Sequence, residues 1–275
     1  MSGKLYVVGT PIGNLGDFSP RGTEVLSSVD FIAAEDTRVT AKLLARFGIR
    51  KPLVSYHEHN RRESGGKILA RLRNGEACAL VTDAGMPTIS DPGEVLVRDA
   101  YLAGVAMESV PGPVAFATAL AMSGMPCGRF CFEGFLSTNT SARRAHLASL
   151  RDEARTLVFY EAPHKLPYTL RDLYGALGER EISLCRELTK LHEEVVRCTL
   201  SEAIARCEEI PPRGEYVLIV AGAEPKDPEH MTLEEAVAIA QDAITNGESP
   251  TAAAKNAAKL SGVARSEIYR RLTAR

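Results

Sequence analysis

The sequence has no excess of either charge and no apolar run long enough to cross a membrane. Its 275 residues contain 33 Lys and Arg against 35 Asp and Glu, which gives a net charge of −2. The longest apolar runs, such as 114–122 and 216–223, fall well short of the roughly 20 residues that a membrane span needs. The N-terminus also lacks the pattern of a signal peptide. We therefore expect a soluble, cytoplasmic protein with no membrane association.

The sequence also lacks the usual spacing of disulfide and metal sites. Its six cysteines stand singly and form no Cys-x-x-Cys pair, which is typical of reduced thiols, and we expect most of them to be buried. His57 and His59 alternate along a predicted strand and could face one metal ion, but no third ligand lies near them in the sequence. We expect no metal site and interpret the two histidines as hydrogen-bonding groups.

The length and the hydrophobic content of 45% predict about two domains with sizeable cores. Over residues 1–112 short apolar strings alternate with helical patterns, which is typical of an α/β domain with a parallel sheet covered by helices. Over residues 113–224 predicted strands outnumber helices, and we expect a second α/β domain with a mixed sheet.

A third segment follows a stretch at 224–228 that resembles a linker. Three helical patterns, at 233–245, 250–260 and 265–273, predict a helix-turn-helix-like domain over 229–275, with Gly262 in the turn between the last two helices.

The balanced net charge hides an uneven distribution. Residues 38–73 contain ten basic and two acidic side chains, a local charge of +8. Residues 226–248 sum to −5 and residues 249–275 to +5. Positive charge clustered in two places is typical of a surface that binds a polyanion, although solvated helix faces could carry the same charges.

Three loops rich in Gly, Pro and small polar residues follow predicted strands, at 9–17, 82–93 and 111–115. Neither the Gly-x-Gly-x-x-Gly dinucleotide fingerprint nor the Gly-x-x-x-x-Gly-Lys phosphate-binding loop is present. Ligands of parallel sheets bind beyond the carboxyl ends of the strands, and glycine allows either a tight turn or a close approach of the backbone to a ligand. The loops predict a site for a cofactor with adenosine, ribose and amino-acid groups.

Seven motifs, in order, carry a resemblance to a known family. They read VGTPIGNLGDFSPRG, AEDTR, SYHEHN, VTDAGMPTISDPG, VPGPVAFATALAMSG, FYEAPHKL and CRELTKLHEE. Residues 4–223 resemble the tetrapyrrole methylase superfamily and, within it, the bacterial 16S rRNA cytidine 2′-O-ribose methyltransferases. The tail resembles the small helical domain that many members append. The first loop reads PIGNLGD where the tetrapyrrole branch has GPGD, which argues against a porphyrinoid substrate.

The resemblance implies a class III S-adenosyl-L-methionine methyltransferase with two α/β domains, usually a homodimer, whose cofactor lies in the cleft between those domains. It implies rRNA processing by ribose 2′-O-methylation, with 16S rRNA or the 30S subunit as partner. The positions that match cofactor-binding residues of the family are Pro11, Asp83, Gly85, Met86, Thr88, Ile89, Val114, Ala115 and Tyr160.

Methylation of a ribose hydroxyl requires alignment of the reacting atoms and removal of the hydroxyl proton. We hypothesise that Lys190 or Glu161 assists this deprotonation, although a surface pair with Glu193 would also explain Lys190. Arg143 and Arg144 are either a solvated helix start or a phosphate clamp. The residues that we expect to position RNA are Asp36, Arg38, His59, Asn60 and Arg61.

Other functions stay open. The chain could be a small-molecule methyltransferase of the same superfamily acting on a tetrapyrrole precursor, or a protein methyltransferase like the diphthine synthases. It could also be a non-catalytic RNA-binding module. A nucleotide-dependent oxidoreductase is disfavoured because the sequence lacks both nucleotide-binding fingerprints.

Overall fold

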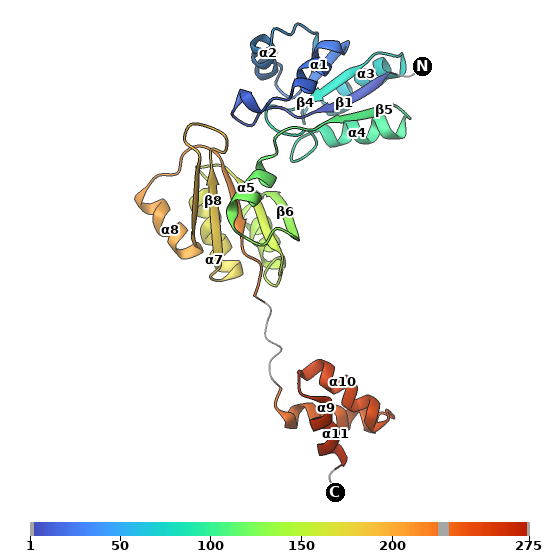
Figure 1. Ribbon diagram of the computed structural model, residues 1–275, viewed down its shortest axis with the longest axis vertical. Coiled ribbons are helices and arrows are strands. Elements are labelled where there is room, and N and C mark those ends of the chain that lie inside the picture. Colours follow the sequence, from blue (N-terminus) through green and yellow to red (C-terminus); the bar gives the residue numbers. More distant parts are fainter. Residues whose placement is uncertain (1–2, 225–230, 274–275) are drawn as a thin grey trace. The chain divides into compact units, whose positions relative to one another are not determined.

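The computed structural model describes residues 3–224 and 231–273 and divides the chain into two compact units, Met1–Gly222 and Ala223–Arg275. In the described residues both sheets lie in the first unit, and the second unit is helical (Figure 1). Most of the predicted linker at 224–228 lies outside the described residues. No helix of the described ranges is long and apolar enough to cross a membrane.

The first sheet is parallel throughout, with the order β3-β2-β4-β1-β5, as the alternating pattern predicts. Its strands are β1 (Lys4–Val8), β2 (Phe31–Ala34), β3 (Leu53–Ser55), β4 (Cys78–Val81) and β5 (Ala106–Val110). The central strands β2 and β4 are buried along their whole length, because helices cover both faces of the sheet.

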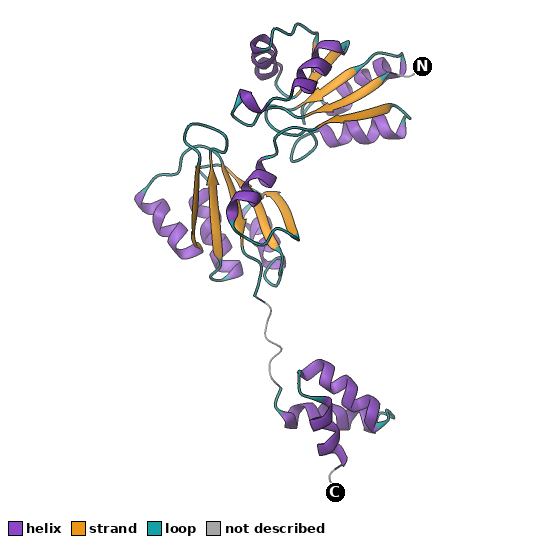
Figure 2. Ribbon diagram, viewed as in Figure 1, coloured by secondary structure: helices purple, strands orange, loops and turns teal. Residues whose placement is uncertain are grey.

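Each face of this sheet has its own hydrophobic core. Val25, Leu26 and Leu44 pack on one face, and Ile68 and Leu96 pack on the other. The connecting helices are η1 (Leu15–Asp17), α1 (Pro20–Ser28), α2 (Thr37–Arg46), α3 (Arg61–Arg73) and α4 (Gly93–Leu102). Helices α1 and α2 therefore cover one face, and α3 and α4 cover the other (Figure 2).

The second sheet is mixed, as predicted, with the order β6-β7-β10-β8-β9 and one parallel pair, β6 with β7. Its strands are β6 (Phe130–Phe135), β7 (Thr156–Glu161), β8 (Glu181–Arg186), β9 (Glu194–Thr199) and β10 (Tyr216–Val220). Helix α5 (Ala115–Ser123) packs on one face. The other face is covered by α6 (Thr140–Ser149), α7 (Leu166–Leu177) and α8 (Leu200–Glu209). The sequence suggested a helix start at Arg143 and Arg144, within α6, but no helix was assigned to the residues of α7 and α8.

The second unit is a small three-helix bundle. It contains α9 (Leu233–Thr245), α10 (Pro250–Ser261) and α11 (Arg265–Thr273), which match the predicted ranges to within one residue. Gly262 ends α10 in the left-handed conformation with a φ of 71°, so a short turn joins α10 to α11. The core is rich in alanine, including Ala236, Ala253 and Ala257, which allows the helices to pack closely.

All six cysteines are free thiols. The expectation that most are buried is wrong, because only Cys78 and Cys185 are buried and Cys127 is exposed. Burial raises the pKa of Cys78 to about 12 and that of Cys185 to about 11. Both of these thiols are therefore protonated at neutral pH.

Candidate active site

A cavity of about 660 Å³ lies within the first unit, at the carboxyl ends of the first sheet's strands. The loop after β4 forms one wall, and the ends of β7 and β8 form another. A cavity of this size is typical of sites for cofactors and small ligands. Its position matches the expectation that ligands bind where parallel strands end.

Most of the residues expected to bind a cofactor or to take part in catalysis line this cavity. They are Asp83, Gly85, Met86, Ile89, Val114, Ala115, Tyr160, Glu161 and Lys190. Two predicted cofactor residues, Pro11 and Thr88, lie outside the lining. The five predicted RNA-positioning residues also lie outside it, so the structure separates them from the enclosed part of the site.

The glycines of the loops allow three backbone segments to pack against each other. A Cβ atom on Gly9 would lie 2.7 Å from the Cα of Gly112. Gly85 adopts a φ of 90°, and its backbone exchanges two hydrogen bonds with Thr10, at 2.9 and 3.2 Å. Gly9, Gly85 and Gly112 therefore allow the loops to contact each other closely.

Backbone strain is concentrated around the cavity. Four non-glycine residues of the described ranges have a positive φ: Thr88, Ser90, Glu187 and Thr189. Asp91 stabilises the loop after β4, because its Oδ1 accepts hydrogen bonds from the backbone N–H of Thr88 at 2.8 Å and of Gly93 at 2.9 Å. Strain of this kind accumulates at functional sites, where the surrounding structure holds it.

Carboxylates give the cavity an acidic side. Asp83 and Asp91 both line it, and burial raises the pKa of each above the ordinary value of 3.8. Glu35, also in the lining, accepts a hydrogen bond from the Thr82 hydroxyl at 2.6 Å. The sequence places Asp91 in the 82–93 loop expected to hold a cofactor but does not single it out, and Glu35 lies in the AEDTR motif, directly after β2.

Lys190 lies between two carboxylates at the edge of the cavity. Its Nζ donates to Glu187 Oε1 at 2.9 Å and to Glu215 Oε2 at 3.0 Å. Burial alone would lower the pKa of Lys190, but the two carboxylates outweigh that effect and raise it above 10.5. Lys190 is therefore a protonated cation at neutral pH and, in this state, a hydrogen-bond donor rather than a base.

The expected pair of Lys190 with Glu193 is not formed. Glu193 instead accepts the backbone N–H of Thr189 at 2.6 Å and so stabilises the loop. A Cβ atom on Gly13 would collide with the Lys190 side chain, so the glycine of the first loop lets Lys190 approach that loop. The lysine thus connects the loop after β1 to the loop after β8.

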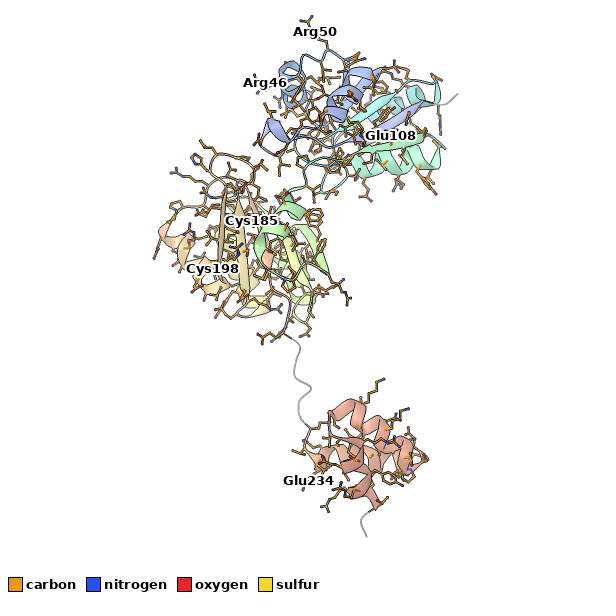
Figure 3. The ribbon with its side chains drawn as sticks, in the orientation of Figure 1. Arg46, Arg50, Glu108, Cys185, Cys198 and Glu234 are labelled. Carbon is orange, nitrogen blue, oxygen red and sulfur yellow. The ribbon has the colours of Figure 1, made fainter. Side chains whose placement is uncertain are left out.

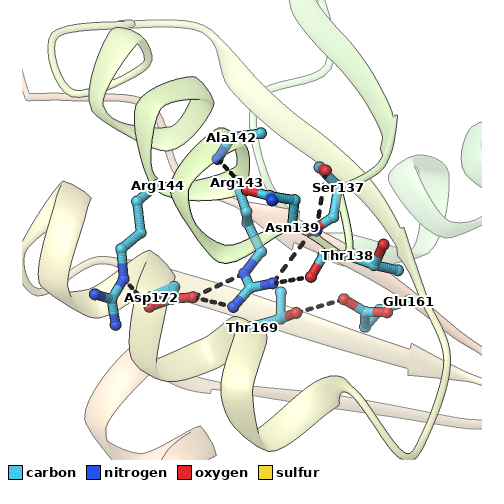
Figure 4. Close-up of polar contacts among 9 residues, drawn as sticks. All are labelled: Ser137, Thr138, Asn139, Ala142, Arg143, Arg144, Glu161, Thr169 and Asp172. Carbon is cyan, nitrogen blue, oxygen red and sulfur yellow. Dashed lines mark hydrogen bonds and ion pairs between the residues drawn. The ribbon is translucent and has the colours of Figure 1, made fainter.

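Glu161 is buried, with 4% of its surface exposed. One carboxylate oxygen accepts the backbone N–H of Ala162 at 2.8 Å. The other accepts the hydroxyl of Thr169 at 2.5 Å, as Figure 4 shows. Both oxygens are engaged within the second sheet and α7. The contacts make Glu161 an anchor of the loop after β7.

Arg143 and Arg144 both bind Asp172, at 2.7 and 3.0 Å (Figure 4). The Arg143 side chain is 14% exposed and also donates to the carbonyl of Ser137 at 3.2 Å. The Arg144 side chain is 69% exposed. Arg143 thus ties α6 to α7, and neither earlier interpretation, a solvated helix start or a phosphate clamp, describes it.

The predicted RNA-positioning residues are largely engaged in local structure. Asp36 caps α2 by accepting the backbone N–H of Arg38 at 2.8 Å. Asn60 accepts the His57 N–H at 2.9 Å and donates to the Ser55 carbonyl at 3.2 Å, which shapes the turn after β3. Arg61 pairs with Glu58 at 2.8 Å.

His57 and His59 lie in that turn, so the expectation of alternating histidines on a strand is wrong: β3 ends at Ser55. Their ring centroids are 5.9 Å apart. The described residues contain no group of three side chains that could hold a metal ion.

The sequence reading missed several other lining residues, among them Phe135 and His164. Phe135 is 59% exposed, and its ring centroid lies 5.3 Å from that of Tyr160. A bulge in β6 between Phe132 and Gly134 shifts the register just before Phe135. Such a bulge has no clear sequence pattern beyond the glycine itself.

The family model described as Tetrapyrrole (Corrin/Porphyrin) Methylases matches residues 4–204. Similar curated proteins carry the name Ribosomal RNA small subunit methyltransferase I. The protein of Synechocystis sp. is 52% identical over 226 residues, 82% of this chain and 81% of its own length. The protein of Xylella fastidiosa is 45% identical over 271 residues, 97% of this chain and 98% of its own.

Two solved structures have a similar fold at low sequence identity. A uroporphyrin-III-C-methyltransferase from Thermus thermophilus is 20% identical, with a TM-score of 0.57 over 80% of this chain and 94% of that one. A diphthine synthase is 15% identical, with a TM-score of 0.60 over 80% of this chain and 90% of that one.

Proposed function

This chain belongs to the tetrapyrrole methylase family, and we propose that it uses S-adenosyl-L-methionine to methylate the ribose 2′-oxygen of a cytidine in the 16S rRNA of the small ribosomal subunit. The observation that carries the proposal is Lys190, a protonated lysine fixed by two carboxylates at the edge of the cavity. The near full-length identity to rRNA methyltransferases supports the choice of substrate.

The cavity fits S-adenosylmethionine in size and chemistry. A volume of about 660 Å³ suits a nucleoside with an amino-acid chain. The carboxylates of Glu35, Asp83 and Asp91 suit its ribose hydroxyls and its cationic groups, and apolar side chains such as Ile12 and Met86 suit the adenine and the methionine chain.

S-adenosylmethionine, when bound, supplies a methyl group already activated by its sulfonium. The protein must then align the acceptor oxygen with that methyl group, which contributes roughly 7 to 11 kcal/mol in well-oriented reactions. It must also stabilise the negative charge that develops as the hydroxyl loses its proton. Preorganised donors in a water-poor site are effective in this role.

Lys190 provides this stabilisation. Its ammonium group donates to the 2′-oxygen and favours the alkoxide, while Glu187 and Glu215 keep the ammonium charged and in place. The hydroxyl proton passes to a solvent water as the 2′-oxygen bonds to the methyl carbon and the carbon–sulfur bond breaks, with its electron pair left on the sulfur. Glu161 acts through the loop after β7, which it anchors at Ala162. Lys190 is thus a charge-stabilising donor rather than a base, and Glu161 is a positioning residue.

The same proposal includes the assembly and location of the protein. We propose two α/β domains, 1–112 and 113–224, and a helical domain, 229–275. The family resemblance supports a homodimer, which light scattering of the purified protein tests by its mass. An rRNA substrate implies a cytoplasmic protein.

The decisive experiment incubates the protein with S-adenosylmethionine labelled in its methyl group, together with either 30S subunits or free 16S rRNA. The 2′-O-methylated positions are then mapped. We expect one cytidine to be labelled on its ribose, and Lys190→Ala to abolish most of the label. The proposal would be contradicted by label on a base or on a ribosomal protein. It would also be contradicted if neither RNA substrate were labelled while a tetrapyrrole precursor was methylated.

A further inference from the structure

The cationic window at 38–73 has two halves that differ in the structure. Between residues 37 and 57 the sequence has five Lys or Arg and no Asp or Glu. The remainder of the window carries its own acidic side chains. The two halves therefore present different amounts of uncompensated charge.

In the half that contains α3, ion pairs neutralise much of the charge. Arg61 pairs with Glu58 at 2.8 Å, and Lys67 pairs with Glu63 at 2.6 Å. Arg71 pairs with Glu76, and its guanidinium stacks 3.5 Å from the centroid of the Phe31 ring. These three cations stabilise the first domain locally.

In the half that contains α2, three cations form a stripe. Arg38, Lys42 and Arg46 are exposed and follow each other at four-residue intervals, so they share one face of the helix. The rise of about 1.5 Å per residue separates neighbours by roughly 6 Å along the axis. The opposite face, with Thr40 and Leu44, is buried against the sheet.

Two further cations, Arg50 and Lys51, continue this surface after α2. No carboxylate of the described residues forms an ion pair with Lys42, Arg46, Arg50 or Lys51. Arg46 and Arg50 lie at the outer edge of the first unit in Figure 3, which leaves their side chains open to a partner. We call Arg38, Lys42, Arg46, Arg50 and Lys51 the α2 cationic surface.

This surface begins next to the cavity. Asp36, the N-cap of α2, donates its backbone N–H to Asp83 Oδ1 at 3.0 Å. Asp83 and Glu35 line the cavity. Arg38 pairs with Asp36 at 2.5 Å, yet its side chain is 86% exposed. A chain bound along α2 would therefore reach the cavity at the N-terminal end of the helix.

We propose that the α2 cationic surface binds the phosphodiester backbone of the RNA strand whose target nucleotide enters the cavity. The inference rests on the proposed function, because it takes RNA as the substrate. Its support is charge complementarity, because a row of cations, of which only Arg38 has an ion-pair partner among the described residues, matches a polymer with one negative charge per nucleotide. The paired cations of α3 contribute little to this binding.

The test measures the affinity of the full-length protein for 16S rRNA as a function of salt. The variant Lys42→Gln/Arg46→Gln removes two charges from the surface. The control Lys67→Gln/Arg98→Gln removes two charges from exposed positions on α3 and α4 that have acidic partners. Each lost phosphate contact lowers the slope of log affinity against log salt by about 0.7 to 0.9, so we expect a decrease of roughly 1.4 to 1.8 for the first variant and almost none for the control.

A second variant, Lys42→Arg/Arg46→Lys, keeps both charges and should retain the wild-type slope, which separates charge from helix packing. S-adenosylmethionine affinity should stay unchanged in all variants, because α2 lies outside the cavity lining. Equal slopes for the α2 variant and the control would overturn the inference. The inference would also be overturned if Lys42→Gln/Arg46→Gln lost binding to anionic phospholipid vesicles but kept the rRNA affinity of wild type. Failure of the proposed function differs from both, since wild type would then not methylate rRNA at all.

Discussion

The sharpest prediction concerns the charge of Lys190. Lys190→Ala removes a donor held by two carboxylates at 2.9 and 3.0 Å. Removal of one donor that stabilises charge in a transition state costs about 10²- to 10³-fold in rate, or about 2.7 to 4 kcal/mol. We expect a loss of this size in single-turnover methyl transfer to 30S subunits, with the affinity for S-adenosylmethionine nearly unchanged.

The pH dependence separates a donor from a base. Because the pKa of Lys190 is raised above 10.5, the wild-type lysine stays charged through pH 10. Lys190 then causes no decrease in rate up to that pH. Glu187→Gln and Glu215→Gln remove the charges that raise the pKa and leave burial, which lowers it. The alkaline decrease in rate should therefore move to lower pH in these variants.

The assay is the single-turnover rate with labelled S-adenosylmethionine from pH 6 to 10. Glu193→Gln is the control, because the Glu193 carboxylate accepts from the Thr189 backbone N–H and makes no ion pair with the Lys190 ammonium. Its pH profile should resemble that of wild type. If Lys190 were the base, the rate would rise about tenfold per pH unit toward its pKa. A rise of this kind that disappears in Lys190→Ala would refute the donor role, as would a wild-type rate in that variant.

Two further predictions concern stability, measured by urea unfolding. Arg143→Ala should cost about 3 kcal/mol, because it leaves the Asp172 side chain, which is only 10% exposed, with one exposed partner, whereas Arg144→Ala should cost less than about 1 kcal/mol. Burial raises the pKa of Asp172, but the two arginines outweigh burial, so the pKa lies below the ordinary value of 3.8. The ionised Asp172 therefore stabilises the folded state fully above pH 3.8, and this contribution to the free energy of unfolding is lost in stronger acid. Asp172→Asn should make the acid-induced loss of stability smaller. Thr169→Val should cost about 1.5 to 3 kcal/mol by removing a donor to the buried Glu161, and Thr169→Ser should restore it.

The sequence predicted those helices and strands whose residues form a clear local pattern. The buried runs of β2 and β4 and the loops after them are visible as short apolar strings followed by Gly, Pro and Asp. Helix α6 buries a single residue, Leu147, so its apolar periodicity is weak and only its charged start could be suggested from the sequence. Helix α7 was also not assigned, although it has a clearer apolar pattern. Its buried leucines lie on one face, at Leu166, Leu170, Leu173 and Leu177.

The partners of Lys190 could not be predicted in the same way. Glu187 lies three residues before Lys190, but Glu215 lies 25 residues after it. They meet because β8 and β10 pair antiparallel, with Arg186 opposite Tyr216, which brings Glu187 and Glu215 to the same edge of the sheet. Glu193 lies only three residues from Lys190 in the sequence, and this proximity suggested the wrong ion pair.

The distribution of ion pairs in the cationic window follows a rule that the sequence does contain. On a helix, opposite charges three or four residues apart are neighbours, and Glu58 with Arg61 and Glu63 with Lys67 have this spacing. Lys42 and Arg46 have no acidic residue at such a distance on either side. The local charge of +8 over residues 38–73 therefore overstates the charge available to bind a partner. When the ion pairs at these spacings are subtracted, most of the remaining charge lies on and after α2, and the expected RNA contact moves from α3 to α2.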